Sequence, residues 1–115
     1  MKTEFKLIAD LIETNTRVLD VGCGDGTLME FLKNNKEINV RGIEISKSNI
    51  QQCIGKGLTV IEGDAEQDLS QFPDASFDFV ILSQTLQAFL NPEKVISELL
   101  RVGKKAIVTI PNFGY

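Results

Sequence analysis

A strand that runs into three alternating glycines is the sequence feature that most constrains how this chain folds. Residues 18–21 open the stretch with apolar and β-branched side chains, and Gly22, Gly24 and Gly26 follow at every second position. Residues 27–32 then show helical spacing. Glycine lets the backbone reach positive φ and lets a ligand approach the main chain, while the helix behind it presents unpaired N–H groups. The stretch therefore predicts a binding site for an anionic or polar small molecule; a turn that only packs helix on strand is the alternative.

The bulk composition is that of a single globular domain. The chain has 115 residues, of which 43% are apolar and 24% charged, and this is enough for a hydrophobic core. The net charge is −4 and the lysines and arginines are scattered, so we expect neither a nucleic-acid partner nor a membrane-surface helix. No apolar run is long enough to span a bilayer and residues 1–4 do not begin a signal peptide, so we expect a cytoplasmic protein. Cys23 and Cys53 are expected to be free thiols, and a structural zinc site is not expected without histidine.

Apolar periodicity predicts strands that alternate with helices. This alternation favours a parallel sheet with right-handed crossovers, in which the strand at 77–82 is expected to be central. Ser46 and Asn91 are expected to cap the helices that follow them, and Pro92 suits the first turn of the second of these. The predicted strands cover 17–21, 40–45, 58–61, 77–82 and 105–110; the predicted helices cover 3–13, 26–34, 47–55 and 92–102, with a loop or one short helical piece over 66–76.

Each predicted helix has an apolar side, which is expected to face the sheet in the second helix and to be buried in the fourth. One such side per helix is what packing against a sheet requires, because the opposite side stays in water. The residues expected on these sides are Phe5, Leu7, Ile8, Leu11 and Ile12 in the first helix, Leu28, Phe31 and Leu32 in the second, Ile50, Cys53 and Ile54 in the third, and Val95, Ile96, Leu99 and Leu100 in the fourth.

Polar residues stand at the carboxyl ends of the predicted strands, where parallel sheets bind ligands. Glu44 is placed to accept two hydrogen bonds from a ribose diol; a solvated or helix-capping carboxylate is the alternative. Asp64 either accepts a hydrogen bond from the exocyclic amine of adenine or occupies a Gly-Asp turn. Asp20 is expected to lie partly buried under the glycine loop and to hold it through bonds to backbone N–H groups. The Gly-x-Gly-x-Gly spacing is tighter than that of dinucleotide-binding folds and suits a smaller ligand than NAD.

Residues 18–26 resemble motif I of class I S-adenosylmethionine-dependent methyltransferases. Glu44 matches the acid after the second strand of that superfamily, and residues 63–65 match its adenine-side loop. The resemblance implies a Rossmann-like α/β fold: a five-stranded parallel sheet in the order 3-2-1-4-5 with helices on both faces, lacking the last two strands. It implies S-adenosylmethionine or S-adenosylhomocysteine as the cofactor, with Asp20, Gly22 and Gly24 cradling its methionine part, Glu44 on the ribose hydroxyls and Asp64 facing adenine. The candidate cofactor-binding residues are Asp20, Gly22, Cys23, Gly24, Glu44, Ile45, Asp64, Ala65 and Ser83.

A narrower resemblance covers almost the whole chain. Residues 81–87, 100–103 and 110–115 are similar to the MetW family of methionine-biosynthesis proteins. The resemblance implies a role in making methionine alongside homoserine O-acetyltransferase, as a partner of that enzyme. Members of the methyltransferase superfamily usually continue to two further strands, whereas this chain stops just after the fifth. We therefore expect residues 1–115 to form a single domain that is either C-terminally truncated or a short version of the fold, and whose fifth strand is an exposed edge.

The sequence does not identify catalytic residues. The place after the fourth strand where amine methyltransferases of bases carry Asn-Pro-Pro-Tyr is filled here by residues 83–86, and the chain has no histidine to act as a base. Three hypotheses follow. The protein is a regulatory partner that senses S-adenosylmethionine, an active methyltransferase on a small metabolite held above Ser83 and Gln84, or a scaffold that binds no ligand.

Overall fold

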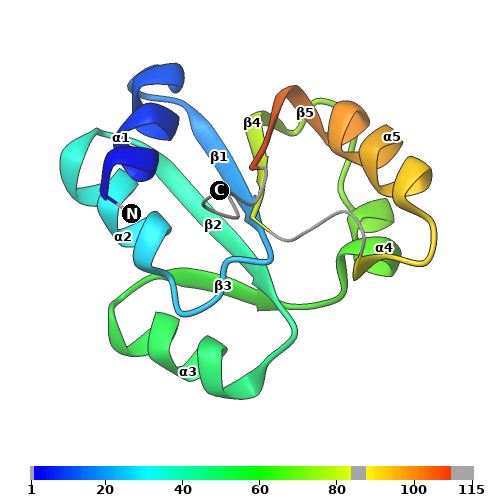
Figure 1. Ribbon diagram of the computed structural model, residues 1–115, viewed down its shortest axis with the longest axis horizontal. Coiled ribbons are helices and arrows are strands. Elements are labelled where there is room, and N and C mark those ends of the chain that lie inside the picture. Colours follow the sequence, from blue (N-terminus) through cyan, green and yellow to red (C-terminus); the bar gives the residue numbers. More distant parts are fainter. Residues whose placement is uncertain (1, 84–87, 110–115) are drawn as a thin grey trace, which may run out of the picture.

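Five parallel strands form one sheet in the order β3-β2-β1-β4-β5 (Figure 1). The computed structural model describes residues 2–83 and 88–109. The strands are β1 (Arg17–Val21), β2 (Asn39–Glu44), β3 (Thr59–Glu62), β4 (Phe77–Leu82) and β5 (Gly103–Val108). The predicted order is thus confirmed. The expectation that the strand at 77–82 is central needs correction, because β1 is the middle strand and β4 lies between it and the edge strand β5.

Helices cover both faces of the sheet, as the alternation of strands and helices predicts. One face carries α1 (Lys2–Leu11), α2 (Thr27–Asn35) and α3 (Lys47–Gly55); the other carries the short α4 (Ala65–Asp68), the 3₁₀ helix η1 (Leu69–Gln71) and α5 (Pro92–Val102) (Figure 1). A first hydrophobic core lies between the sheet and α1, α2 and α3, and a second lies between the sheet and α4, η1 and α5. Successive side chains of β1 point to opposite faces, so Val18 lies in the first core, while Leu19 and Val21 lie in the second.

The predicted helix starts at Ser46 and Asn91 are confirmed. The Ser46 hydroxyl accepts a hydrogen bond from the Asn49 N–H at 3.3 Å, and the Asn91 side chain accepts one from the Lys94 N–H at 3.2 Å. Pro92 follows Asn91 at the first turn of α5, where its missing N–H removes no helical bond. These caps fix where α3 and α5 begin.

The buried sides of the helices are narrower than the sequence predicts. Five residues on the predicted apolar sides are substantially exposed: Leu7, Leu11, Ile54, Ile96 and Leu100. In α5 the buried residues are Val95, Leu99 and Val102, a single stripe at the spacing of one helix face. The sheet touches only that stripe, and neighbouring apolar positions face water because no other element covers them among the described residues. Met29, which the periodicity did not single out, is fully buried in α2.

Two parts of the prediction lie outside the described residues. The C-terminal end of the predicted fifth strand, at 110, and the segment 84–87 are not described. Within the described part of the chain, no helix is long and apolar enough to cross a bilayer.

Candidate functional site

The candidate site lies at the carboxyl ends of β1 and β2, next to the point where the strand order reverses. Consecutive strands are added on one side of β1 up to β3, and the chain then crosses to β4 on the other side. Such a switch point opens a crevice beyond the strand ends. The glycine loop after β1 lies there, with φ of +73° at Gly22, +60° at Gly24 and +87° at Gly26. These left-handed values explain the glycines, because other residues are strained in this region.

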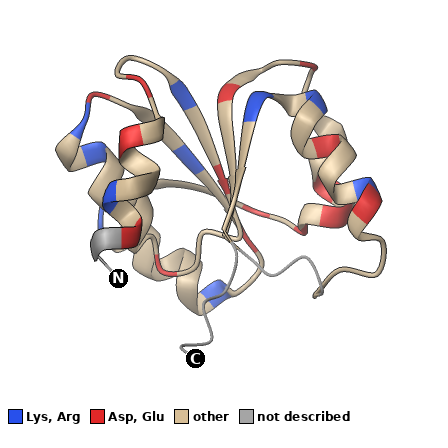
Figure 2. Cartoon of the chain, turned by 45° about the horizontal axis from the view of Figure 1, so that its top comes forward, with Lys and Arg blue, Asp and Glu red and all other residues tan. Residues whose placement is uncertain are grey.

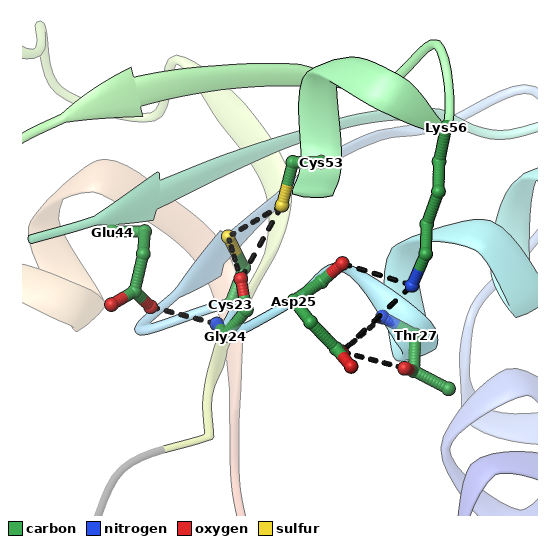
Figure 3. Close-up of polar contacts among 7 residues, drawn as sticks. All are labelled: Cys23, Gly24, Asp25, Thr27, Glu44, Cys53 and Lys56. Carbon is green, nitrogen blue, oxygen red and sulfur yellow. Dashed lines mark hydrogen bonds and ion pairs between the residues drawn. The ribbon is translucent and has the colours of Figure 1, made fainter. Parts of the chain in front are cut away.

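Glu44 holds the glycine loop. Its Oε1 accepts a hydrogen bond from the Gly24 N–H at 2.7 Å (Figure 3), and its Oε2 accepts one from the Ser46 N–H at 3.0 Å. The side chain is largely buried, with 8% of the residue exposed. A carboxylate offers about four lone-pair directions, so roughly two remain free to accept hydrogen bonds from a ligand. The structure thus places Glu44 on the same side of the sheet as the glycines, as a shared site requires.

A cavity of about 170 Å³ opens beside Glu44. It is lined by five of the candidate residues and by four residues that the sequence analysis did not identify. The candidates are Gly22, Glu44, Ile45, Asp64 and Ala65. The further lining residues are Ile43, Glu66, Ala88 and Phe89, together with Gly63 of the loop after β3. The segment before α5 has no regular period, so no sequence signal pointed to Ala88 or Phe89.

The loop after β3 forms one wall of this cavity and is fixed by its own hydrogen bonds. Asp64 caps α4, because its Oδ1 accepts a hydrogen bond from the Glu66 N–H at 3.0 Å. The Asp64 N–H in turn donates to Asp68 Oδ2 at 2.6 Å. Asp64 is therefore a helix N-cap, which is neither of the two roles that the sequence left open, and the residue also borders the cavity.

Asp20 is fully buried and does not hold the glycine loop, which corrects the prediction for this residue. Its Oδ1 accepts a hydrogen bond from the Ser83 hydroxyl at 2.7 Å, and its Oδ2 has no hydrogen-bond partner among the described residues. Burial raises the pKa of Asp20 to about 7; the Ser83 bond opposes this shift and the Glu44 charge adds to it. Asp20 is thus a carboxyl group with one oxygen left for a further partner.

A second cavity, of about 390 Å³, lies on the α1 side of the glycine loop. Asp20, Cys23 and Ser83 line it, so eight of the nine candidate residues divide between two cavities, and Gly24 lines neither of them. The remaining lining residues come from α1, from the start of α2 and from the end of β5: Glu4, Phe5, Ile8, Asp25, Thr27, Leu28 and Thr109.

Polar contacts brace the glycine loop against α3 (Figure 3). The Lys56 ammonium donates to the Asp25 carbonyl oxygen at 3.0 Å, and Asp25 Oδ1 accepts hydrogen bonds from the N–H and the hydroxyl of Thr27. These Thr27 bonds lower the pKa of Asp25. Cys23 and Cys53 are free thiols with their sulfur atoms 3.9 Å apart, and burial raises the pKa of both. Within the described residues, no group of three or more His, Cys, Asp or Glu side chains is arranged to hold a metal ion.

Comparison with known proteins places this geometry in a family. The family model for methionine biosynthesis protein MetW matches residues 2–115. The bifunctional methionine biosynthesis protein MetXA/MetW of Rhodopirellula baltica is 36% identical over 116 aligned residues, which cover 94% of this chain and 19% of that protein. Among solved structures, a SAM-dependent methyltransferase from Archaeoglobus fulgidus aligns with a TM-score of 0.79 and 27% identity, over 89% of this chain and 46% of that one. The [4+2]-cyclase SpnF aligns with a TM-score of 0.77 and 26% identity, over 88% and 40%.

The chain thus spans only part of each of these longer proteins, while the family match extends over almost all of its own length. The fold is that of the class I methyltransferases, and the chain belongs to the family of methionine biosynthesis protein MetW.

Proposed function

We propose that this chain binds S-adenosylmethionine or S-adenosylhomocysteine and acts in methionine biosynthesis together with homoserine O-acetyltransferase. The observation that carries the binding proposal is the Glu44 carboxylate, which is 8% exposed, is bonded to the Gly24 N–H and borders the 170 Å³ cavity. A ribose diol donates two hydrogen bonds, and Glu44 has accepting capacity left for them.

The first cavity has the chemistry of a nucleoside site. Its acidic lining residues are Glu44, Asp64 and Glu66, and its described lining residues include no lysine or arginine. In Figure 2 acidic segments, in red, lie in the middle of the picture, where the strands end. Carboxylates accept from hydroxyl and amino groups and repel phosphates, so this lining favours a ligand without a pyrophosphate. Ile45 is 61% exposed and supplies apolar surface for a base at the cavity wall.

The buried Asp20 oxygen supports a ligand that carries positive charge. Its Oδ2 has no partner among the described residues and Asp20 borders the second cavity, where Cys23 and Ser83 also lie. A buried carboxylate is costly unless it is paired, so an ammonium or sulfonium group near this oxygen is stabilised. S-adenosylmethionine, when bound, supplies a methyl group made electrophilic by its sulfonium. Glu44 in the first cavity and Asp20 in the second would then hold the two ends of such a ligand.

A role next to homoserine O-acetyltransferase is supported by the bifunctional relative, in which a MetW part is named together with MetXA. The protein then serves as a ligand-binding partner whose occupancy changes the acetyltransferase. Co-purification of the two proteins and a change in the acetyltransferase rate on adding this chain are the expected results. A rate that stays the same at saturating concentrations, with and without S-adenosylmethionine, contradicts the partner role.

Methyl transfer to a small metabolite is the second candidate function. The observation that favours it is the 390 Å³ cavity on the α1 side of the glycine loop, which borders Ser83 and is larger than the 170 Å³ cavity beside Glu44. A screen of cell extract with S-adenosylmethionine labelled on its methyl group tests this function. Absence of labelled small molecules, with protein that binds the donor, argues for the partner role alone.

Calorimetric titration with S-adenosylhomocysteine tests ligand binding. Glu44→Ala should weaken binding by about 1–3 kcal/mol, because it leaves donors of the ligand unpaired. Glu62→Ala is a matched control: Glu62 is exposed and pairs with Glu44 across β2 and β3, but it does not line either cavity. Equal binding by the two variants, or no binding by the unmodified protein, would refute the proposal.

A further inference from the structure

Glu66 joins two of the segments that line the 170 Å³ cavity beside Glu44, which is called the nucleoside cavity below. One is the loop after β3 with the start of α4, and the other is the segment that leads into α5. Glu66 Oε1 accepts a hydrogen bond from the Leu90 N–H at 3.0 Å, and Oε2 accepts one from the Asn91 N–H at 2.8 Å. Among the described residues, no other hydrogen bond ties residues 88–90 to the loop after β3.

The two hydrogen bonds from Leu90 and Asn91 to Glu66, called the Glu66 clamp below, position the side chain of Phe89. It directly precedes the two clamped N–H groups, lines the cavity, and packs its partly buried ring against the second hydrophobic core. Leu90, by contrast, is 98% exposed, so its own side chain does not anchor the segment. The position of the Phe89 ring over the cavity therefore depends on core packing from one side and on the Glu66 carboxylate from the other.

The clamp needs both the length and the two oxygens of glutamate. Two consecutive N–H groups point at one carboxylate, which receives one bond on each oxygen. Aspartate keeps the charge and remains favourable in the first turn of α4, but its side chain is one carbon shorter. Glutamine keeps the length, but it offers one accepting oxygen and turns an NH₂ group toward the second N–H.

We propose that Glu66 is a positioning residue that sets the width of the slot between the loop after β3 and Phe89, and thereby selects the size of the base that enters it. This inference rests on the proposed binding of an adenosyl ligand in the same cavity. Glu66 acts through the segment 88–91 and does not need to touch the ligand.

The first test compares the binding of adenosine with that of N6-benzyladenosine, a nucleoside whose base is larger, by calorimetric titration of the full chain. The unmodified protein should bind adenosine at least tenfold more tightly. Glu66→Ala and Glu66→Asp should each reduce this preference at least fivefold, and Glu66→Gln should retain an intermediate preference. Gln67→Ala, an exposed position in the same short helix, is the matched control and should leave the preference unchanged.

The order of the variants separates positioning from charge and from loss of stability. If Glu66→Asp keeps the preference and Glu66→Gln loses it, Glu66 acts through its charge and the inference is wrong. An unchanged preference in Glu66→Ala also overturns it. If the unmodified protein binds neither nucleoside nor S-adenosylhomocysteine, the proposed function itself fails.

A spectroscopic measurement tests the clamp without any ligand. The sequence contains no tryptophan, so Phe89→Trp introduces a single reporter at the cavity wall. Adding Glu66→Ala to this variant should shift the tryptophan emission to longer wavelength, because the ring loses its fixed position and becomes more exposed. Adding Gln67→Ala should not. Identical spectra in the two double variants would show that Glu66 does not position residue 89.

Discussion

Replacing Asp20 with asparagine should make the protein more stable at neutral and alkaline pH. Asp20 is fully buried, and its carboxyl group accepts one hydrogen bond from the described residues, which comes from the Ser83 hydroxyl. Burial raises its pKa from 3.8 to about 7, and the nearby Glu44 carboxylate acts in the same direction. Asparagine has nearly the same shape and still offers an oxygen to Ser83, but it never carries the buried charge.

The sign and size of the effect follow from proton linkage. The unfolded chain releases the Asp20 proton near pH 3.8, whereas the folded chain retains it until about pH 7. The folded state therefore loses stability as pH rises between these two values. Each pKa unit corresponds to ~1.36 kcal/mol, so the complete loss is about 4 kcal/mol. Below pH 3.8 the acid is neutral in both states, so Asp20→Asn should match the unmodified protein there. Above pH 7 the variant should be more stable by roughly 2–4 kcal/mol.

Denaturant unfolding at pH 4, 6 and 8 measures this difference directly. The lowered pKa values of Asp25, Asp78 and Glu98 stabilise the fold above their unfolded values and lose this effect in acid, but they do so equally in both proteins and cancel. Asp10→Asn, on the exposed side of α1, is the control and should follow the unmodified protein at all three values. A stability difference that does not grow between pH 4 and pH 8, or that favours aspartate at pH 8, refutes the reasoning.

Two further pairs of variants test the packing around the site. Leu99→Ala, at a residue 1% exposed, should lower the free energy of unfolding by about 2–5 kcal/mol, while Leu100→Ala, 61% exposed, should change it by less than about 0.5 kcal/mol in the same denaturant assay. Gly26→Ala should cost about 1–3 kcal/mol, because φ is +87° and a Cβ there would lie 2.6 Å from Leu58 Cδ1; Gly55→Ala, in open space at the end of α3, should cost nothing.

Local patterns predict most of the framework, because they act within a few residues of one another. The start and end of β1 and β4 were predicted without error, since apolar runs bounded by polar turns mark both. The helix caps at Ser46 and Asn91 could be predicted because each side chain accepts a hydrogen bond from the backbone N–H only three residues later. The exposure of Leu7 and Leu100 could not be predicted this way, because periodicity shows which side of a helix is apolar but not how wide a strip the sheet covers.

The roles of the two acids depend on strand register, which no local pattern specifies. Asp20 pairs with Gly42 and Val21 with Ile43, so Glu44 is level with the first glycine of the loop and its carboxylate reaches Gly24. Asp20 lies two residues before Gly22, inside the sheet. Its carboxyl group therefore accepts a hydrogen bond from Ser83, which follows β4, and does not bond to the loop. The sequence identified both residues as important but assigned the loop-holding role to the wrong one.

The internal hydrogen bonds of the glycine loop change what the site can recognise. The loop and the helix behind it were predicted to bind an anionic or polar small molecule. The N–H groups of Gly22 and Cys23, however, donate to the Ile43 carbonyl, that of Gly24 to Glu44, and that of Gly26 to the Cys23 carbonyl. A phosphate at these four positions would have to displace existing bonds and approach the Glu44 charge, which is unfavourable in a partly buried site. What the loop and strand ends offer instead are carboxylate lone pairs on Glu44 and Asp20. A ligand that donates hydrogen bonds at one end and carries positive charge at the other satisfies both, which is why the geometry favours an adenosyl sulfonium over a dinucleotide.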